Sequence, residues 1–173
     1  MQSQWTLRGH YHSDTQTYKV NHVHLMDLDT IGCWVGLSTH LRPGAVFCTT
    51  DVSYAVRGRP LVSISLFRDG VRPEWEDTHN KDGFNCTMRA EMSSDEVDAL
   101  WGALVMELVR GGFCDSMLGV QLTRKIYRRT PVIKFEVWIA STGSKHVVLK
   151  QLNSLPLAKT PFSCSQRPAP PPT

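Results

Sequence analysis

The stretch Ser65–Gly83, which reads SLFRDGVRPEWEDTHNKDG, is long, polar and irregular, and its single Trp is followed directly by two carboxylates, Glu76 and Asp77. The run Val62–Phe67 that leads into it alternates apolar and polar residues, which is the pattern of a half-buried strand. An indole face attracts positive charge, and a carboxylate accepts parallel N–H bonds. The stretch therefore predicts a loop, anchored on a sheet, that uses Trp75 and Glu76 to bind a flat, cationic, hydrogen-bonding ligand.

Length and composition indicate one domain with its own core, since the chain has 173 residues of which 41% are hydrophobic. We expect this domain over residues 1–165 and a Pro-rich, disordered tail over residues 166–173. The sequence contains no apolar run long enough to span a membrane and no signal-peptide pattern, which predicts a cytoplasmic protein with some nuclear presence allowed. The five cysteines form no CxxC pair, which predicts reduced, mostly buried thiols.

Charge is distributed unevenly along the chain. Residues 1–115 contain 10 Lys and Arg against 15 Asp and Glu, whereas residues 116–173 contain 9 against 1. The C-terminal part therefore has a net charge of +8, which predicts that it meets a polyanion.

Strand patterns dominate the sequence, with helical patterns between them. We expect strands at 5–7, 19–26, 62–67, 84–91, 118–127, 132–140 and 162–164, and helices at 31–41, 94–110 and 144–152. Ser93 and Glu96 form a capping-box pattern before the second helix, and Gly111-Gly112 end it. Residues 42–60 are expected to form a long connection. This order predicts an α+β fold in which one antiparallel sheet has helices on one side.

Four histidines, His10, His12, His22 and His24, form two His-x-His pairs on the first two expected strands. They could supply imidazoles to a metal ion. No Cys or carboxylate completes a known spacing, so we favour solvent-facing histidines at a sheet edge and predict no metal and no cofactor.

The central stretch closely resembles the cap-binding loop of the eukaryotic translation initiation factor 4E family, whose members bind the 7-methylguanosine cap of mRNA. The segment LDTIGCWVGL is similar to the family's FDTVEDFWAL. The resemblance extends over roughly residues 15–140. It implies a single curved antiparallel sheet with about three helices on its convex face and a cap slot on the concave side.

The resemblance also implies roles for individual residues. Trp75 and Tyr18 would stack on the methylated base, although the family has Trp at the position of Tyr18. Glu76 would accept hydrogen bonds from the guanine edge, and Trp138 would touch the methyl group. Base–aromatic stacking contributes about 1–3 kcal/mol per base, so the smaller ring of Tyr18 predicts some loss of affinity. Asp77 is expected to brace the loop.

The triphosphate would be held by cations of the second expected hairpin. Arg124 and Lys134 match the family's phosphate-binding residues. The hairpin is longer than in the family, so Arg128 or Arg129 could substitute or reach the next nucleotides. The alternative for this basic run is a solvated hairpin tip.

The convex face is where the family binds its scaffold, initiation factor 4G, and repressors with a YxxxxLΦ helix. Here Val35 stands in place of the family's Trp, and Gly102 and Ala103 replace two contact residues. We therefore expect a 4G-type scaffold or a specialised binding protein to use the remaining apolar residues, which are Ile31, Trp34, Val35 and Met106.

These features predict a monomeric, non-enzymatic protein that binds capped mRNA in translation initiation or its regulation. An alternative is an interaction module of the same fold that has lost cap binding and acts as a repressor or adaptor. A second alternative is a metal-dependent enzyme that processes nucleotides or caps, but the sequence has no spacing typical of such enzymes.

Overall fold

The computed structural model describes residues 4–12, 22–48, 55–56, 59–74, 76–112, 115–128 and 130–166. Tyr18, Trp75, Arg129 and the Pro-rich residues 167–173 lie outside this part of the chain. No helix in the described residues combines the length and the hydrophobicity that are needed to cross a membrane.

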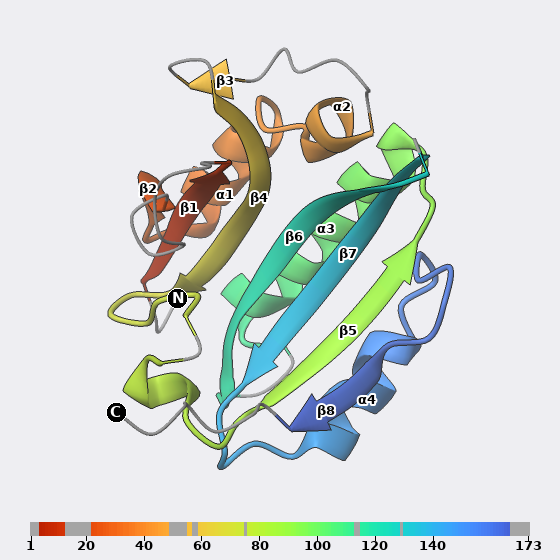
Figure 1. The fold of residues 1–173 in the computed structure, drawn as a ribbon. Helices are drawn as coiled ribbons and strands as arrows, with labels where there is room; N and C mark the ends of the chain where they lie inside the picture. The colour runs from red at the N-terminus through yellow and green to blue at the C-terminus, as the bar shows by residue number, and fades with distance from the viewer. Residues whose placement is uncertain are drawn as a thin grey trace.

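A single curved sheet, all of whose strand pairs are antiparallel, forms the framework (Figure 1). Its strands follow the order β2-β1-β4-β6-β7-β5-β8, and the short β3 pairs with β4 outside this path. The strands are β1 Trp5–Tyr11, β2 His22–Leu28, β3 Ala55–Val56, β4 Arg59–Arg68, β5 Phe84–Ala90, β6 Met117–Tyr127, β7 Thr130–Ile139 and β8 Ser163–Gln166.

The helices lie on one side of this sheet, behind the strands in Figure 1. They are α1 Ile31–Ser38, α2 Pro43–Phe47, α3 Ser94–Arg110 and α4 Lys145–Asn153, and the 3-10 helix η2 Thr78–Asn80 lies in the loop between β4 and β5. The main core fills the space between the sheet and these helices, where alternate strand residues such as Ile64 and Leu66 meet the apolar side of α3, including Trp101 and Leu104. The predicted fold class is confirmed.

Helix α3 begins and ends where the sequence predicts. The Ser93 hydroxyl accepts from the Glu96 N–H at 3.4 Å, and Glu96 Oε2 accepts from the Ser93 N–H at 2.8 Å, which completes the capping box. These bonds from Ser93, together with Lys159, lower the pKa of Glu96 to about 2. Gly111 adopts a left-handed φ of 72°, which glycine tolerates and which ends the helix.

The connection expected over residues 42–60 contains two elements that the sequence reasoning missed, α2 and β3. Helix α2 is held against α3 because Asp98 accepts from the Gly44 N–H at 2.7 Å and from Arg42 Nε at 3.0 Å. The backbones approach so closely that a Cβ at Gly44 would overlap the Ser94 carbonyl. Five residues are too few for the periodic pattern by which a helix is recognised.

Several other boundaries differ from those predicted, most of all in β1, which continues to Tyr11 rather than ending at residue 7, and in β4, which begins at Arg59 rather than at residue 62. Helix α1 ends at Ser38 rather than at residue 41, and β2 continues to Leu28 rather than ending at residue 26. The N-cap of α1 is Thr30, whose side chain accepts from the Cys33 N–H at 3.0 Å. After Ser38 the chain continues in a turn, in which the Leu37 carbonyl accepts from the His40 N–H at 2.9 Å and the Leu41 N–H at 2.7 Å.

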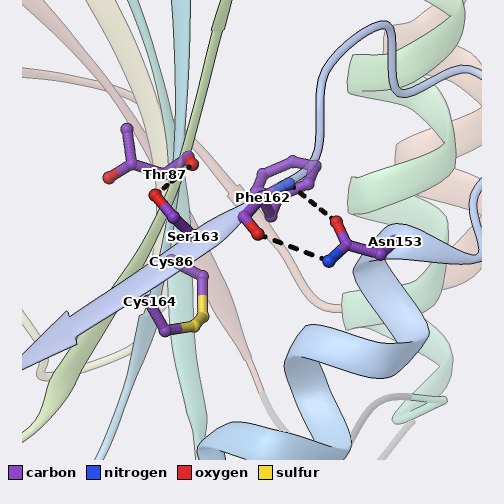
Figure 2. Close-up of a disulfide and its surroundings, with 6 residues drawn as sticks. All are labelled: Cys86, Thr87, Asn153, Phe162, Ser163 and Cys164. Carbon is purple, nitrogen blue, oxygen red and sulfur yellow. Dashed lines mark hydrogen bonds between the residues drawn. A yellow bond between two sulfur atoms is a disulfide. The ribbon is translucent and has the colours of Figure 1, made fainter.

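The prediction that all cysteines are reduced is wrong for Cys86 and Cys164, which form a disulfide. The two residues are directly opposite each other on β5 and β8, so their side chains leave the sheet on the same side (Figure 2). Next to them Asn153 of α4 forms two hydrogen bonds to the Phe162 backbone, at 2.7 Å from its N–H and 3.3 Å to its carbonyl. The last strand is thus fixed to β5 and to α4. The spacing of the cysteines along the chain does not reveal that Cys86 and Cys164 are neighbours.

Candidate functional site

The side of the sheet that faces away from the helices is the front face. Three rows of side chains cross it from β5 to β1, since residues opposite each other in adjacent strands point to the same face. The row nearest the β4–β5 loop contains Asn85, Trp138, Gly119, Phe67 and Thr6. The middle row contains Thr87, Glu136, Gln121, Ser65 and Arg8, and the far row contains Arg89, Lys134, Thr123, Ser63 and His10. The front face is therefore aromatic near the loop, polar in the middle and cationic at the far end of β5 and β7.

Trp138 belongs to a small second core on the front face, together with Phe67, Val71 and Leu118. The rings of Phe67 and Trp138 meet edge to face, with centroids 5.3 Å apart and an interplanar angle of 77°. Gly119 makes this arrangement possible, because a Cβ there would lie 2.5 Å from Phe67 Cγ. Val71, the first buried residue of the loop, fixes the base of the loop against this cluster.

The β4–β5 loop is braced from within by Asp77. Its carboxylate accepts from the Arg72 N–H and the His79 N–H, both at 2.9 Å, and lies 2.9 Å from His79 Nδ1. Burial alone would raise the pKa of Asp77, but these hydrogen bonds outweigh it and lower the pKa. Asp77 thus holds the loop, as the sequence predicts.

Buried Asn80 fastens the other side of the loop. Its side-chain amide donates to the Arg72 carbonyl at 2.7 Å and to the Glu74 carbonyl at 2.6 Å. Arg8 of β1 donates to the Val71 carbonyl at 3.4 Å, which connects the loop to the sheet. The segment on either side of Trp75 is therefore held at three points.

Glu76 is exposed at the surface of this braced loop. It borders an open hollow of about 370 Å³. The hollow is lined by Gly70, Arg72, Glu74, Glu76, Asp77, Thr78 and His79. With three carboxylates in its lining, it suits a ligand that presents N–H donors or positive charge.

Lys134 lies on the front face and is paired with Glu136. Lys134 Nζ is 2.6 Å from Glu136 Oε2, and Glu136 Oε1 accepts from Asn85 Nδ2 at 2.7 Å. Both side chains of the ion pair are largely buried, at 16% and 11% exposure. The acid therefore partly neutralises the cation and fixes its position.

Arg124, which the sequence assigns to the triphosphate together with Lys134, is not on the same face of the sheet as Lys134. Arg124 is opposite Ile133, a fully buried core residue, whereas Thr123 is opposite Lys134. On the helix side, burial and Asp98 raise the pKa of the Cys48 thiol while the charge of Arg124 opposes them, so Arg124 is near α2. A shift of one residue in the register is enough to move a side chain to the other face of a sheet.

The tip of the β6–β7 hairpin is exposed. Arg128 has a left-handed φ of 49°, and its guanidinium lies 5.4 Å from the centroid of the Tyr127 ring. Lys125 points to the front face, since it alternates with Arg124 along β6. The structure thus brings Lys125 rather than Arg124 toward the side of Lys134.

The histidines lie at the β1–β2 edge of the front face. The rings of His10 and His22 are 4.7 Å apart, and His24 Nε2 is 3.0 Å from Asp27 Oδ1. His22 is half-buried rather than solvent-facing, and this burial, together with His10 and Arg8, lowers its pKa to about 4. Across the described ranges, no three His, Cys, Asp or Glu side chains gather to hold a metal ion.

The expected partner surface on the helix side is reduced to part of α1. Ile31 and Val35 are 45% and 51% exposed and, four residues apart, share one side of the helix. Trp34 is only 3% exposed and packs in the main core, so the prediction that it is a surface anchor is wrong. Met106 is partly buried against the same core.

Sequence reasoning missed Arg89, which is exposed on the front face directly opposite Lys134. Its position in the alternation of β5, out of phase with buried Cys86 and Met88, could have revealed the face. That Lys134 of β7 lies opposite Arg89 follows only from the strand pairing, which the sequence alone does not show.

A family model described as Eukaryotic initiation factor 4E matches residues 1–156. The chain belongs to the eukaryotic initiation factor 4E family. It is 30% identical over 103 residues to Eukaryotic translation initiation factor 4E-1 of Schizosaccharomyces pombe, covering 56% of this chain and 47% of the relative. It is 25% identical over 123 residues to Eukaryotic translation initiation factor 4E of Homo sapiens, covering 66% and 49%. The chain thus spans about half the length of the curated relatives that it matches.

Solved structures share the fold of this 4E-family member. C. elegans eIF4E-3, solved with the 4E-binding protein Mextli and a cap analog, superposes with a TM-score of 0.71 at 20% identity, covering 95% of this chain and 90% of that one. Ascaris suum eIF4E-3, solved with the m7G cap, also gives a TM-score of 0.71, at 18% identity, with coverage of 100% and 98%. At these identities the likeness concerns the fold.

Proposed function

We propose that this chain binds the 7-methylguanosine cap of mRNA on its front face and acts in translation initiation or its regulation. The observation that supports this most strongly is the braced loop, which presents Glu76 beside an acidic hollow and is fixed through Val71 to the cluster that contains Trp138. Family membership and the cap-bound neighbours agree with it. Trp75 and Tyr18 lie outside the described part of the chain, so their roles in this proposal rest on the sequence alone.

In this proposal the methylated base stacks on Trp75 and Tyr18. Glu76 accepts from the N–H groups of the guanine edge, and Trp138 borders the N7-methyl group. Methylation at N7 makes the base cationic, which strengthens both the stacking and the hydrogen bonds to a carboxylate. Lys134 then contributes its charge to the triphosphate, and Arg128 and Arg129 reach toward the following nucleotides.

Retention of capped RNA tests this proposal. A short oligonucleotide with a 7-methylguanosine cap should be retained by the immobilised protein, whereas the same oligonucleotide with an unmethylated guanosine cap should not be retained. Glu76→Gln, which keeps the size of the side chain but removes its charge, should reduce the difference. Equal retention of the two oligonucleotides by the wild type would refute cap recognition and favour an interaction module of the same fold.

We also propose that the chain binds the cap without cleaving it. The front face offers carboxylates and imidazoles, but Asp77 is engaged in bracing the loop and Glu136 in an ion pair with Lys134. Incubation with 7-methyl-GTP and Mg²⁺ should release no nucleotide product. Release of one would identify a cap-processing enzyme instead.

A partner on the helix side is the second part of the proposal. Ile31 and Val35 form an exposed apolar pair on α1, and solved relatives include complexes with 4E-binding proteins. We propose that a 4G-type scaffold or a specialised binding protein places an amphipathic helix here. Val35→Asp should weaken its binding without changing the affinity for the cap.

A further inference from the structure

We propose that Arg89 is the second cation of the triphosphate site, paired with Lys134 across β5 and β7. This inference rests on the proposed cap binding and deepens it. It assigns to the phosphate end of the ligand a residue on β5, whereas the sequence pointed to Arg124 on β6.

The placement of Arg89 is set by the strand register. Arg89 is directly opposite Lys134, and their Cβ atoms are therefore about 5 Å apart on the front face. Trp138 is four residues from Lys134 on the same strand and face, which is about 13 Å along an extended chain. A nucleotide whose base lies against Trp138 would extend its phosphates along β7 toward this pair of cations.

The charges around Arg89 favour an anionic ligand. Like charges directly opposite each other destabilise a sheet, so an arginine facing a lysine is unfavourable unless an anion lies between them. Glu136 compensates Lys134, but in the described part of the chain no carboxylate lies within ion-pair distance of Arg89. Arg89 is exposed, and its guanidinium can bind phosphate oxygens in bidentate fashion.

Arg124 provides a matched comparison, because it has the same charge but is on the opposite face. Calorimetric titrations with 7-methyl-GTP, GTP, 7-methylguanosine and inorganic triphosphate should be run on the wild type, Arg89→Ala, Arg89→Lys and Arg124→Ala. We expect Arg89→Ala to weaken the binding of 7-methyl-GTP about tenfold and to leave the affinity for 7-methylguanosine unchanged, since only charged contacts to phosphate are lost. Arg89→Lys should restore part of the loss, and Arg124→Ala should have less than a twofold effect.

Unchanged binding of 7-methyl-GTP in Arg89→Ala, or a larger loss in Arg124→Ala, would overturn the assignment. An equal loss of affinity for 7-methylguanosine and 7-methyl-GTP in Arg89→Ala would also overturn it, since it would indicate a structural defect. If inorganic triphosphate binds through Arg89 but 7-methyl-GTP and GTP bind equally, the phosphate site stands and cap recognition fails. If the wild type binds none of these ligands, both proposals fail.

Discussion

Lys134 Nζ lies 2.6 Å from Glu136 Oε2, so the cation proposed to meet the phosphates already has an anionic neighbour two residues along the same strand. Asn85 holds the other oxygen of this carboxylate. The ion pair therefore both positions Lys134 and lowers its attraction for a second anion.

Glu136→Gln should raise the affinity for 7-methyl-GTP about threefold to tenfold, since it removes a repelling charge while an amide oxygen can still accept from Asn85. The affinity for uncharged 7-methylguanosine should not change. Calorimetry at low and high salt provides the measurement, and the gain should shrink as salt screens the charges. A weakened 7-methyl-GTP affinity would mean that Glu136 is needed chiefly to orient Lys134.

Glu76→Gln and Asp77→Asn should separate recognition from bracing. We expect Glu76→Gln to reduce the preference for 7-methyl-GTP over GTP and to leave the unfolding midpoint unchanged, because Glu76 is exposed. Asp77→Asn should lower the free energy of unfolding by about 1–3 kcal/mol, because Asp77 accepts several hydrogen bonds within the loop. The reverse pattern in titrations and denaturant melts would show that the two roles are exchanged.

Loss of the Cys86–Cys164 bond should destabilise the domain. The two residues are 78 positions apart, and closing a loop of that length contributes about 4 kcal/mol in the chain-entropy estimate. Cys164→Ser and the wild type with excess dithiol reductant should therefore both melt at lower temperature than the oxidised wild type. If the reductant lowers the melting temperature of Cys164→Ser as much as that of the wild type, the bond is not responsible.

Acidification should weaken the fold through His22. Its pKa falls from the ordinary 6.5 to about 4 in the folded protein, because burial, His10 and Arg8 disfavour its charged form. The unfolded chain then binds the proton more readily, so stability is full above pH 6.5 and decreases as the pH falls toward 4. Urea melts across this range should show the loss, and His22→Gln should reduce it. An equally steep loss in His22→Gln would place its origin in other groups.

Substitutions of Trp34 and Val35 should affect different properties of the protein although the two residues are neighbours. Trp34→Ala should lower the free energy of unfolding by about 3–5 kcal/mol, since it empties part of the main core. Val35→Ala should change stability little and reduce binding of the helix-side partner. A Trp34→Ala protein that melts normally would contradict the packing described for α1.

The sequence predicts much of this fold because long periodic patterns decide it. The stripe of α3, its capping box and Gly111 define that helix at both ends, and alternation defines β4, β6 and β7. The fold class follows from their order. The short α2 and β3 lack enough residues to form a pattern, and Cys86 and Cys164 become neighbours only through strand pairing.

The candidate site is predicted less completely, and the reason is the two-residue period of a strand. Glu76, Asp77, Trp138 and Lys134 come from motifs that fix their position along the chain, and the structure places them at the loop and on the front face. Arg124 matches the family's phosphate-binding arginine in the sequence, but it is one residue away from Thr123, the residue of β6 that lies opposite Lys134 on the front face. Arg89 has no motif of its own and is recognised only through the strand that lies beside it.

The most direct test of the account is the ratio of the dissociation constants of 7-methyl-GTP and GTP for the wild-type chain, measured by calorimetry under one set of conditions. The two ligands share the ribose and triphosphate and differ at N7, so the ratio reports on recognition of the cationic base alone. Stacking on Trp75 and hydrogen bonding to Glu76 predict that 7-methyl-GTP binds at least about tenfold more tightly. Equal dissociation constants would contradict cap recognition by this chain.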